Sequence, residues 1–217
     1  MFDFKAARAA MVECQIRTND VTDLDVLKAF RSISRENFVP SAQRALAYGD
    51  SHVPLGDERW VLRPRDHAKM VQAADIQPTD IVLDIGCGRG YSTAILAGLA
   101  ETVIGLEDTD ARVEKATELL SEADMMNAVI VKGELKGGAA EHGPFNVIFV
   151  NGAVSDIAQT WLDQLTHDGR LVCVIQDGKI GRCKVYTRSG DAIGERIVFD
   201  ACLPTLPGFE REEAFSF

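Results

Sequence analysis

The chain has 217 residues, of which 46% are hydrophobic, and it carries a formal net charge of −10. This length suits one domain with a modest extension, and the apolar fraction is large enough to build a core, which excludes a disordered chain. The acidic balance argues against a nucleic-acid-binding protein, which needs a basic face. No stretch of the sequence approaches the ~20 apolar residues that a membrane span requires, so we expect no membrane association.

The cysteines and the N-terminus suggest a compartment. The first ten residues carry charges and lack the apolar segment of a secretory signal. The five cysteines, Cys14, Cys87, Cys173, Cys183 and Cys202, are odd in number and form no C-x-x-C pair. We therefore expect small buried thiols in a cytoplasmic protein, with neither a disulfide framework nor a metal site.

The first part of the chain, residues 1–75, is predicted to be a helical extension that caps the substrate side. Apolar residues recur at three- and four-residue spacing from residue 4 to about residue 14, which predicts a helix. Residues 23–30 and 65–74 predict two more helices. Residues 48–64 contain two glycines and two prolines, and this composition predicts an irregular segment.

The second part, residues 76–217, alternates between strand and helix patterns. Short apolar runs predict strands at 81–85, 102–106, 128–131, 145–150 and 170–175, with helices at 91–99, 111–123 and 155–165 between them. This alternation predicts an α/β, Rossmann-like sheet of mostly parallel strands. Residues 183–187 and 196–202 are strand-like with no helix between them, which predicts an antiparallel C-terminal part.

A glycine-rich loop lies between the first predicted strand of this sheet and its helix. Its sequence is Asp84-Ile85-Gly86-Cys87-Gly88-Arg89-Gly90. Glycines allow a ligand to approach the backbone closely and adopt positive φ at little cost. Glu107 ends the next predicted strand, where a carboxylate can accept hydrogen bonds from both ribose hydroxyls of a nucleoside; Asp108 is a weaker candidate. The alternative is a glycine-rich turn followed by surface acids.

Two nucleotide cofactors fit such a loop. A dinucleotide-binding loop reads G-x-G-x-x-G, but the position of its last glycine is Tyr91 here. Asp84 would repel a pyrophosphate, whereas it would attract the cationic amino group or sulfonium of S-adenosylmethionine. The loop therefore favours S-adenosylmethionine, with Cys87 and Tyr91 among the residues that line its site.

Two further segments follow predicted strands at the same edge of the sheet. Glu134 is placed to bond an adenine amino group and Leu135 to cover the ring, although a plain turn is nearly as consistent with the spacing. Asn151 follows the fourth predicted strand, where the methyl-transfer face of such a sheet lies, or it completes a turn. We predict that these residues belong to the cofactor site.

Several motifs resemble the protein-L-isoaspartate O-methyltransferase family. They are Arg8-Ala9-Ala10-Met11-Val12-Glu13-Cys14-Gln15-Ile16-Arg17, Ser34-Arg35-Glu36-Asn37-Phe38-Val39-Pro40, Ala47-Tyr48-Gly49-Asp50, the loop ending in Gly90-Tyr91, Pro144-Phe145-Asn146-Val147-Ile148 and Asp168-Gly169-Arg170-Leu171. The resemblance extends over most of the chain. It implies an S-adenosylmethionine-dependent enzyme that methylates an isoaspartyl carboxylate of damaged protein or peptide, a repair reaction.

The chain departs from this family at one segment. The family has Thr-Ile-Ser-x-Pro, and its serine is assigned to the active site. Anchored on Pro64, this chain has Trp60 at the threonine position and Leu62 at the serine position, so neither hydroxyl is present. His67 matches a position where some members carry a cofactor-contacting histidine, and a helix-surface histidine is the equal alternative.

The missing serine leaves the acceptor contacts open. A carboxylate acceptor is already ionised at neutral pH, so catalysis is mainly positioning and desolvation. Arg59, Arg63 or Arg65 could hold an anionic acceptor, with Arg59, Arg63 and Asn151 as the candidates for the catalytic site; the alternative is that these arginines pair with some of the chain's 33 acids.

The residues support four functions, in decreasing order. The first is an isoaspartyl methyltransferase with altered acceptor contacts. The second is a methyltransferase of the same fold with another, unidentified acceptor. The third is a protein that binds S-adenosylmethionine without catalysis, and a nicotinamide-dependent oxidoreductase is a distant fourth.

Overall fold

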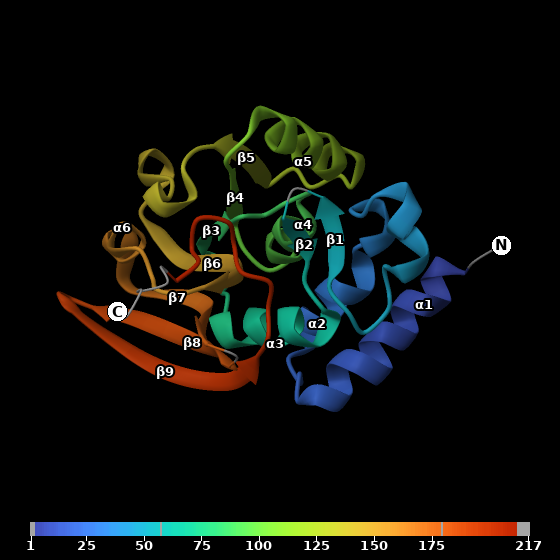
Figure 1. The fold of residues 1–217 in the computed structure, drawn as a ribbon, viewed down its shortest axis with the longest axis horizontal. Helices are drawn as coiled ribbons and strands as arrows, with labels where there is room; N and C mark the ends of the chain where they lie inside the picture. The colour runs from blue at the N-terminus through green and yellow to red at the C-terminus, as the bar shows by residue number, and fades with distance from the viewer. Residues whose placement is uncertain (1–2, 57, 179, 212–217) are drawn as a thin grey trace, which may run out of the picture.

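The computed structural model describes residues 3–56, 58–178 and 180–211. Within them, the centre is a seven-stranded sheet of order β5-β4-β3-β6-β7-β8-β9 (Figure 1). Its parallel strands are β3 Ile81–Ile85, β4 Thr102–Glu107, β5 Ala128–Lys132, β6 Phe145–Val154 and β7 Leu165–Asp177, followed by the antiparallel β8 Ile180–Ser189 and β9 Ala192–Ala201. This architecture confirms the predicted Rossmann-like methyltransferase sheet, including its antiparallel C-terminal part.

Helices cover both faces of the sheet. They are α1 Phe4–Met11, α2 Leu24–Ser32, α3 Pro64–Ala74, α4 Tyr91–Ala97, α5 Asp110–Glu122 and α6 Gln159–Asp163. Successive strand residues point to opposite faces. Val82 accordingly joins the core beneath the N-terminal helices, α4 and α5, whereas Leu83 joins the core beneath α6. The predicted N-terminal helices are therefore part of one core with the sheet.

Two predicted elements need correction. The strand predicted to end at residue 150 continues to Val154, and the helix expected over residues 155–165 is only the short α6. The Ser155 N–H donates to the Phe209 carbonyl at 2.9 Å, and β7 begins at Leu165, so both ends of the expected helix are taken up by other pairing. The Ala153 N–H donates to the Pro204 carbonyl at 2.9 Å, and the Leu206 N–H donates to the Ala153 carbonyl at 2.9 Å. This pairing with the C-terminal segment keeps the end of β6 extended, and it could not be seen in the local sequence.

The segment predicted to be irregular contains a hairpin. Its strands are β1 Val53–Gly56 and β2 Arg59–Val61, paired antiparallel with Val53 opposite Val61. Both valines are buried, so one face of this small sheet packs into the core. Burial of its alternate residues stabilises the hairpin despite Pro54, because a proline is tolerated on a short edge strand.

Arg35 connects the motif at residues 34–40 to the motif at residues 47–50 and to the hairpin. Arg35 is fully buried; its Nε donates to the Ala47 carbonyl at 2.6 Å and its Nη2 to the Leu62 carbonyl at 2.7 Å. Its guanidinium also lies 4.9 Å from the centre of the Tyr91 ring, a cation–π contact. Arg35 therefore joins the segment that follows β2 to the start of α4, immediately after the glycine loop.

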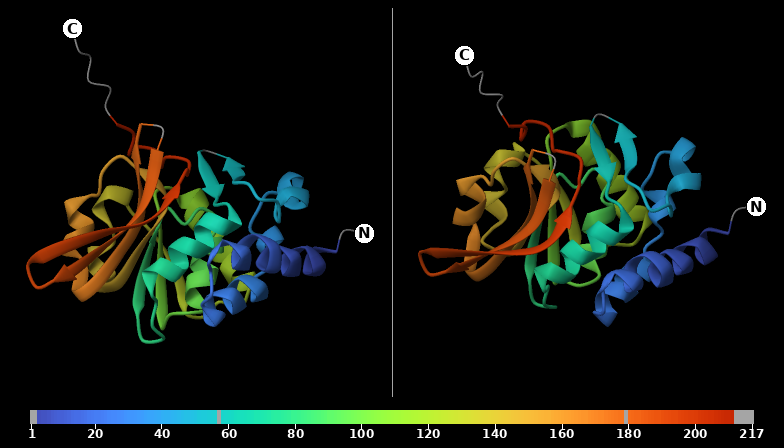
Figure 2. Two further views of the ribbon diagram at one scale, coloured as in Figure 1. Left: turned by 90° about the horizontal axis from the view of Figure 1, so that it is seen from below. Right: turned by 60° about the horizontal axis from the view of Figure 1, so that its bottom comes forward.

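The β1–β2 hairpin and the C-terminal segment after β9 lie over the same end of the molecule (Figure 2). His52 connects them: its Nδ1 accepts from the Arg63 N–H at 2.9 Å, so its Nε2 carries the proton that it donates to the Cys202 carbonyl at 3.0 Å. Burial lowers the pKa of His52, which favours this neutral form. Parts of the chain 150 residues apart thus meet above the sheet.

Two further expectations concern membrane-spanning helices and the burial of the cysteines. Across the described ranges, no helix combines the length and apolarity needed to cross a bilayer. Cys87, Cys173 and Cys183 are buried thiols as expected, but Cys14 and Cys202 are exposed, so the expectation of burial was wrong for these two.

Gly105 of β4 allows the sheet to pack against the glycine loop. A Cβ at this position would lie 2.4 Å from Ile130 Cδ1 and 3.1 Å from both Cys87 Sγ and Thr93 Oγ1. We expect Gly105→Ala to lower the free energy of unfolding by about 1–3 kcal/mol through overpacking. Urea unfolding measures this, with Gly194→Ala as control, because a Cβ on Gly194 meets nothing within 4 Å. Equal stability of the two variants would contradict the packing described.

Candidate cofactor and acceptor site

The glycine loop has the backbone conformation that its composition predicts. Gly86, Gly88 and Gly90 have φ of 69°, 62° and 86°, a region that other residues rarely adopt. A Cβ on Gly88 would also lie 2.8 Å from Leu55 Cδ1 of the hairpin. Glycine at position 88 therefore meets a conformational requirement, and a larger side chain there would also have to displace the Leu55 methyl group.

Glu107 lies against this loop. Parallel pairing of β3 with β4 places Ile85 beside Leu106, so the residues that follow both strands meet at one edge of the sheet. The Glu107 side chain is fully buried, and its Oε1 accepts from the Gly88 N–H at 2.6 Å. The sequence separates these two residues by 19 positions, and the fold joins them as the nucleoside-binding hypothesis requires.

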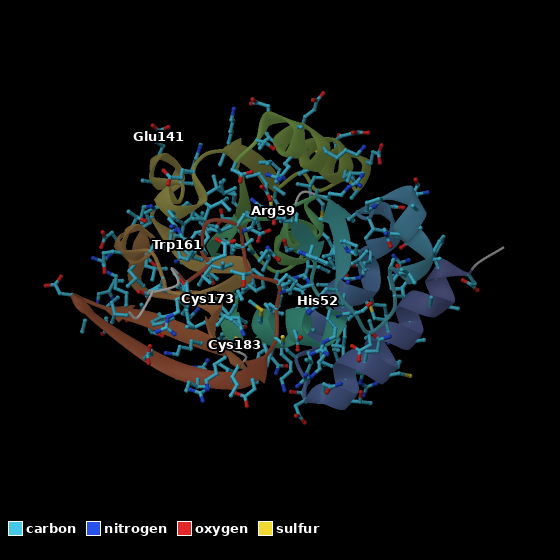
Figure 3. The ribbon with its side chains drawn as sticks, in the orientation of Figure 1. His52, Arg59, Glu141, Trp161, Cys173 and Cys183 are labelled. Carbon is cyan, nitrogen blue, oxygen red and sulfur yellow. The ribbon has the colours of Figure 1, made fainter. Side chains whose placement is uncertain are left out.

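The guanidinium of Arg59 also binds this carboxylate. Its Nε lies 3.1 Å from Glu107 Oε1, and its Nη2 lies 3.3 Å from Glu107 Oε2 and 3.0 Å from Asp108 Oδ2. Arg59 is 3% exposed and lies in the interior (Figure 3). The sequence offered Arg59 as a partner of an anionic acceptor or of the chain's own acids, and in this structure its partners are Glu107 and Asp108.

Asp84 is the centre of a buried polar cluster on the other side of the loop. Its Oδ2 accepts from Ser92 Oγ at 2.7 Å and from Thr93 Oγ1 at 2.6 Å, and its Oδ1 accepts from Asn151 Nδ2. Complete burial raises the pKa of Asp84 to about 7, against the opposing effect of these donors. The fold thus brings the predicted residues Asp84 and Asn151 together. Asp84 is the penultimate residue of β3, whereas Asn151 lies within β6 and does not follow it, because this strand continues to Val154.

A separate cavity of about 210 Å³ lies between the ends of β4 and β5 and the C-terminal segment. It is lined by Asp108, Glu134, Leu135, Lys136, Pro207, Gly208 and Phe209. Two of these, Glu134 and Leu135, are the residues predicted to contact an adenine. The aromatic wall that Phe209 provides was missed, because its position 75 residues after Glu134 gives no local signal.

His67 and Tyr91 lie in an aromatic cluster in the core. The His67 ring is 5.1 Å from Phe30, 5.7 Å from Tyr91 and 5.7 Å from Phe149, measured between ring centres. Its burial lowers the pKa to about 3, so the ring is neutral at physiological pH. A surface histidine on this helix is therefore excluded. Neither ring nitrogen has a hydrogen-bond partner among the described residues.

The segment that departs from the family is well packed. Leu62 is 2% exposed and belongs to the core beneath the N-terminal helices. Arg63 binds Asp66 through an Nη2–Oδ2 contact of 2.7 Å, and Arg65 Nη1 lies 3.4 Å from Asp66 Oδ1. In this structure, therefore, Arg63 and Arg65 both pair with one of the chain's own acids, Asp66.

Three residues that the sequence patterns did not indicate also belong to this region. Ser92 and Thr93 bind Asp84 from the first turn of α4, and hydroxyl residues directly after the loop were the available signal. Leu206 of the C-terminal segment packs against two glycines. A Cβ added to Gly86 would lie 3.1 Å from the Leu206 side chain, and a Cβ added to Gly152 would lie 2.6 Å from it. Nothing in the local sequence around Leu206 indicates this contact.

Comparison with known proteins identifies the family. The model of the family described as protein-L-isoaspartate(D-aspartate) O-methyltransferase matches residues 6–202. The chain belongs to this family. It is therefore related to S-adenosylmethionine-dependent methyltransferases, which agrees with the resemblance found in its motifs.

Individual family members support the assignment. A protein-L-isoaspartate O-methyltransferase 1 from Syntrophobacter fumaroxidans is 34% identical over 190 residues, which cover 88% of each chain. One from Methanoculleus marisnigri is 36% identical over 168 residues, covering 77% of this chain and 76% of the relative. Among solved structures, a putative member from Plasmodium falciparum, in complex with S-adenosyl-L-homocysteine, is 20% identical and superposes with a TM-score of 0.79 over 95% of this chain and 99% of that one.

The raised pKa of Asp84 predicts a pH dependence of stability. The folded protein holds a proton on Asp84 up to about pH 7, whereas the unfolded chain releases it near 3.8. The contribution of Asp84 to stability therefore falls as pH rises between these values, by at most about 1.4 kcal/mol per pH unit.

Asp84→Asn removes this titration and preserves the shape of the side chain. We expect the free energy of unfolding of the variant, minus that of the wild type, to rise from pH 5 to pH 7 and to level off above it. Urea unfolding at half-unit intervals measures the difference. Two parallel pH profiles would show that Asp84 does not titrate in this range.

Proposed function

We propose that this chain transfers the methyl group of S-adenosylmethionine to the free α-carboxylate of an isoaspartyl residue in damaged protein, the residue that the names of its relatives specify. The contact between Glu107 and the Gly88 N–H carries this proposal, because it joins the acid predicted to bind the ribose to the glycine loop of a chain whose family match spans residues 6–202. The formal net charge of −10 supports a protein rather than a nucleic-acid acceptor.

The residues present fit the cofactor in their chemistry. Glu107 would hold the ribose hydroxyls, and Glu134 and Leu135 would contact the adenine in the cavity that they line with Phe209. Asp84 would face the cationic amino-acid end. The loop positions Gly86, Cys87, Gly88, Gly90 and Tyr91, together with Asp108, Asn151 and His67, complete the proposed cofactor site. S-adenosylmethionine, when bound, supplies an electrophilic methyl group on a sulfonium.

The acceptor needs positioning more than acid–base help. An isoaspartyl carboxylate is already ionised at neutral pH, so no base is needed to activate it. Leu62 offers no hydroxyl, and we therefore assign the polar contacts with the acceptor to Arg59, Arg63 or Asn151. The Arg63 side chain is 26% exposed, so it is reachable by an incoming peptide.

The two parts of the chain have different tasks in this proposal. Residues 76–217 bind the cofactor, and residues 1–75 cap the acceptor side, a division supported by the hairpin that packs Leu55 over Gly88. The free thiols of all five cysteines support action in the reducing cytoplasm. A methyltransferase with another acceptor remains the second candidate, and the observation that favours it is Leu62 in place of the serine.

The central prediction is methyl-ester formation on an isoaspartyl peptide. With tritiated S-adenosylmethionine, the wild-type protein should label an isoaspartyl peptide with a base-labile methyl group and leave the matching aspartyl peptide unlabelled. If neither peptide is labelled while an active relative labels the first, and S-adenosylhomocysteine still binds, the chain either has a different acceptor or binds the cofactor without catalysis. Absence of both labelling and binding would refute the proposed function.

Gly88→Val tests the cofactor site. We expect this variant to weaken S-adenosylhomocysteine binding at least ~10-fold, because the side chain would clash with Leu55 and the positive φ would be strained. Calorimetric titration measures the affinity, and Gly190→Val is the matched control, since Gly190 also has positive φ (61°) but lies in an open β-turn far along the sequence. Equal affinity of Gly88→Val and wild type would place the cofactor elsewhere.

A further inference from the structure

Every acceptor position on the Glu107 carboxylate is already filled. A carboxylate offers about four lone-pair positions. Glu107 Oε1 accepts from the Gly88 N–H at 2.6 Å and from Arg59 Nε at 3.1 Å, and Oε2 accepts from Arg59 Nη2 and from the Asp108 N–H, both at 3.3 Å. The side chain is also fully buried. Ribose hydroxyls can therefore reach Glu107 only if one of these donors leaves.

Arg59 is the donor that can leave. The N–H groups of Gly88 and Asp108 belong to the loop and to the end of β4, which the seven-stranded sheet holds in place. Arg59 instead comes from β2, which pairs only with β1 in a separate two-stranded sheet among the described residues. Its long side chain can turn without moving the main sheet.

The surroundings of Arg59 provide room and a remaining partner. A cavity of about 270 Å³ adjoins its side chain and is lined by Leu55, Gly56, Gly88, Arg89 and residues of α5. Asp108 Oδ2, at 3.0 Å from Arg59 Nη2, can keep the charge paired after Glu107 is released, because Asp108 is 37% exposed and not confined to the buried site. Nη1 is buried without a hydrogen-bond partner in the described part of the chain, so the present arrangement does not satisfy the guanidinium fully.

We propose that Arg59 is an internal competitor for the ribose-binding carboxylate, so that the cofactor binds by displacing its guanidinium from Glu107. The inference rests on the proposed function only in taking Glu107 as the ribose acid. Arg59 thereby sets the affinity for the cofactor, which must break two charge-assisted hydrogen bonds before it gains its own.

The opposite role for Arg59 predicts the opposite result. If Arg59 only orients Glu107 for the ribose, removing it leaves a misplaced carboxylate and weakens cofactor binding. If Arg59 competes, removing it strengthens cofactor binding. The sign of the change in affinity therefore distinguishes a competitor from a positioning residue.

The experiment is calorimetric titration of S-adenosylhomocysteine into the wild type, Arg59→Gln and Arg59→Lys. We expect Arg59→Gln to bind about 10-fold tighter than the wild type, equivalent to about 1.4 kcal/mol. Arg59→Lys should lie between them, because an ammonium keeps the charge but loses the two-pronged geometry. Lys115→Gln, a change of charge at the same cavity, should stay within about two-fold of the wild type.

Adenine serves as the control ligand because it has no ribose. Its affinity, measured by ligand-observed NMR, should be the same in the wild type and Arg59→Gln. Unchanged or weaker S-adenosylhomocysteine binding by Arg59→Gln would overturn the inference and leave the proposed function intact. If Arg59→Gln does not fold, Arg59→Lys takes its place: tighter binding than the wild type supports the inference, and unchanged or weaker binding overturns it. Absence of binding by the wild type and both variants would refute the proposed function together with the inference.

Discussion

The buried carboxylate of Glu107 is the contact on which the site depends, because three parts of the chain meet there. The glycine loop contributes the Gly88 N–H, the end of β4 contributes the acid itself, and the β1–β2 hairpin contributes Arg59. A buried carboxylate is tolerated only when it is paired and hydrogen-bonded. The parallel pairing of β3 with β4 brings the acid to the loop, and the hairpin supplies the compensating charge.

The contact between Arg59 and Glu107 also depends on where the β1–β2 hairpin lies. The hairpin is held by Arg35, which binds the carbonyls of Ala47 and Leu62, and by His52, which reaches the Cys202 carbonyl. Motifs near the N-terminus that resemble family signatures therefore act structurally, by placing the hairpin over the loop. Since Arg59 is carried by that hairpin, the position of the hairpin and access to Glu107 are coupled.

The acidic groups on the two sides of the loop differ in their surroundings. Glu107 faces a guanidinium and two backbone N–H groups, whereas Asp84 faces only neutral donors and is held near its point of titration by burial. A cationic ligand beside Asp84 would favour its ionised form, whereas a neutral ribose beside Glu107 must replace a cation. The two ends of the proposed cofactor site thus have opposite electrostatic requirements.

The sequence by itself determined the class of fold, the glycine loop, the acid that meets it and the family. These features are local: the alternation of apolar runs fixes strands and helices, and parallel strands bring consecutive strand ends to one edge. The same reasoning selected Glu134 and Leu135, which line one cavity, and Asp84 and Asn151, which bond to each other.

Only the tertiary structure decided which groups surround those residues. Three features join segments at least 48 residues apart: the extension of β6 to Val154, the wall formed by Phe209 and the pairing of Arg59 with Glu107. The hairpin at 53–61 pairs neighbouring residues, but its place over the glycine loop is also set by contacts with distant segments. The local sequence offers Arg59 many acidic partners, and a chain with 33 acids does not indicate which one it meets. Burial selects Glu107, because in the low-dielectric interior a charge must find its partner within reach of the side chain.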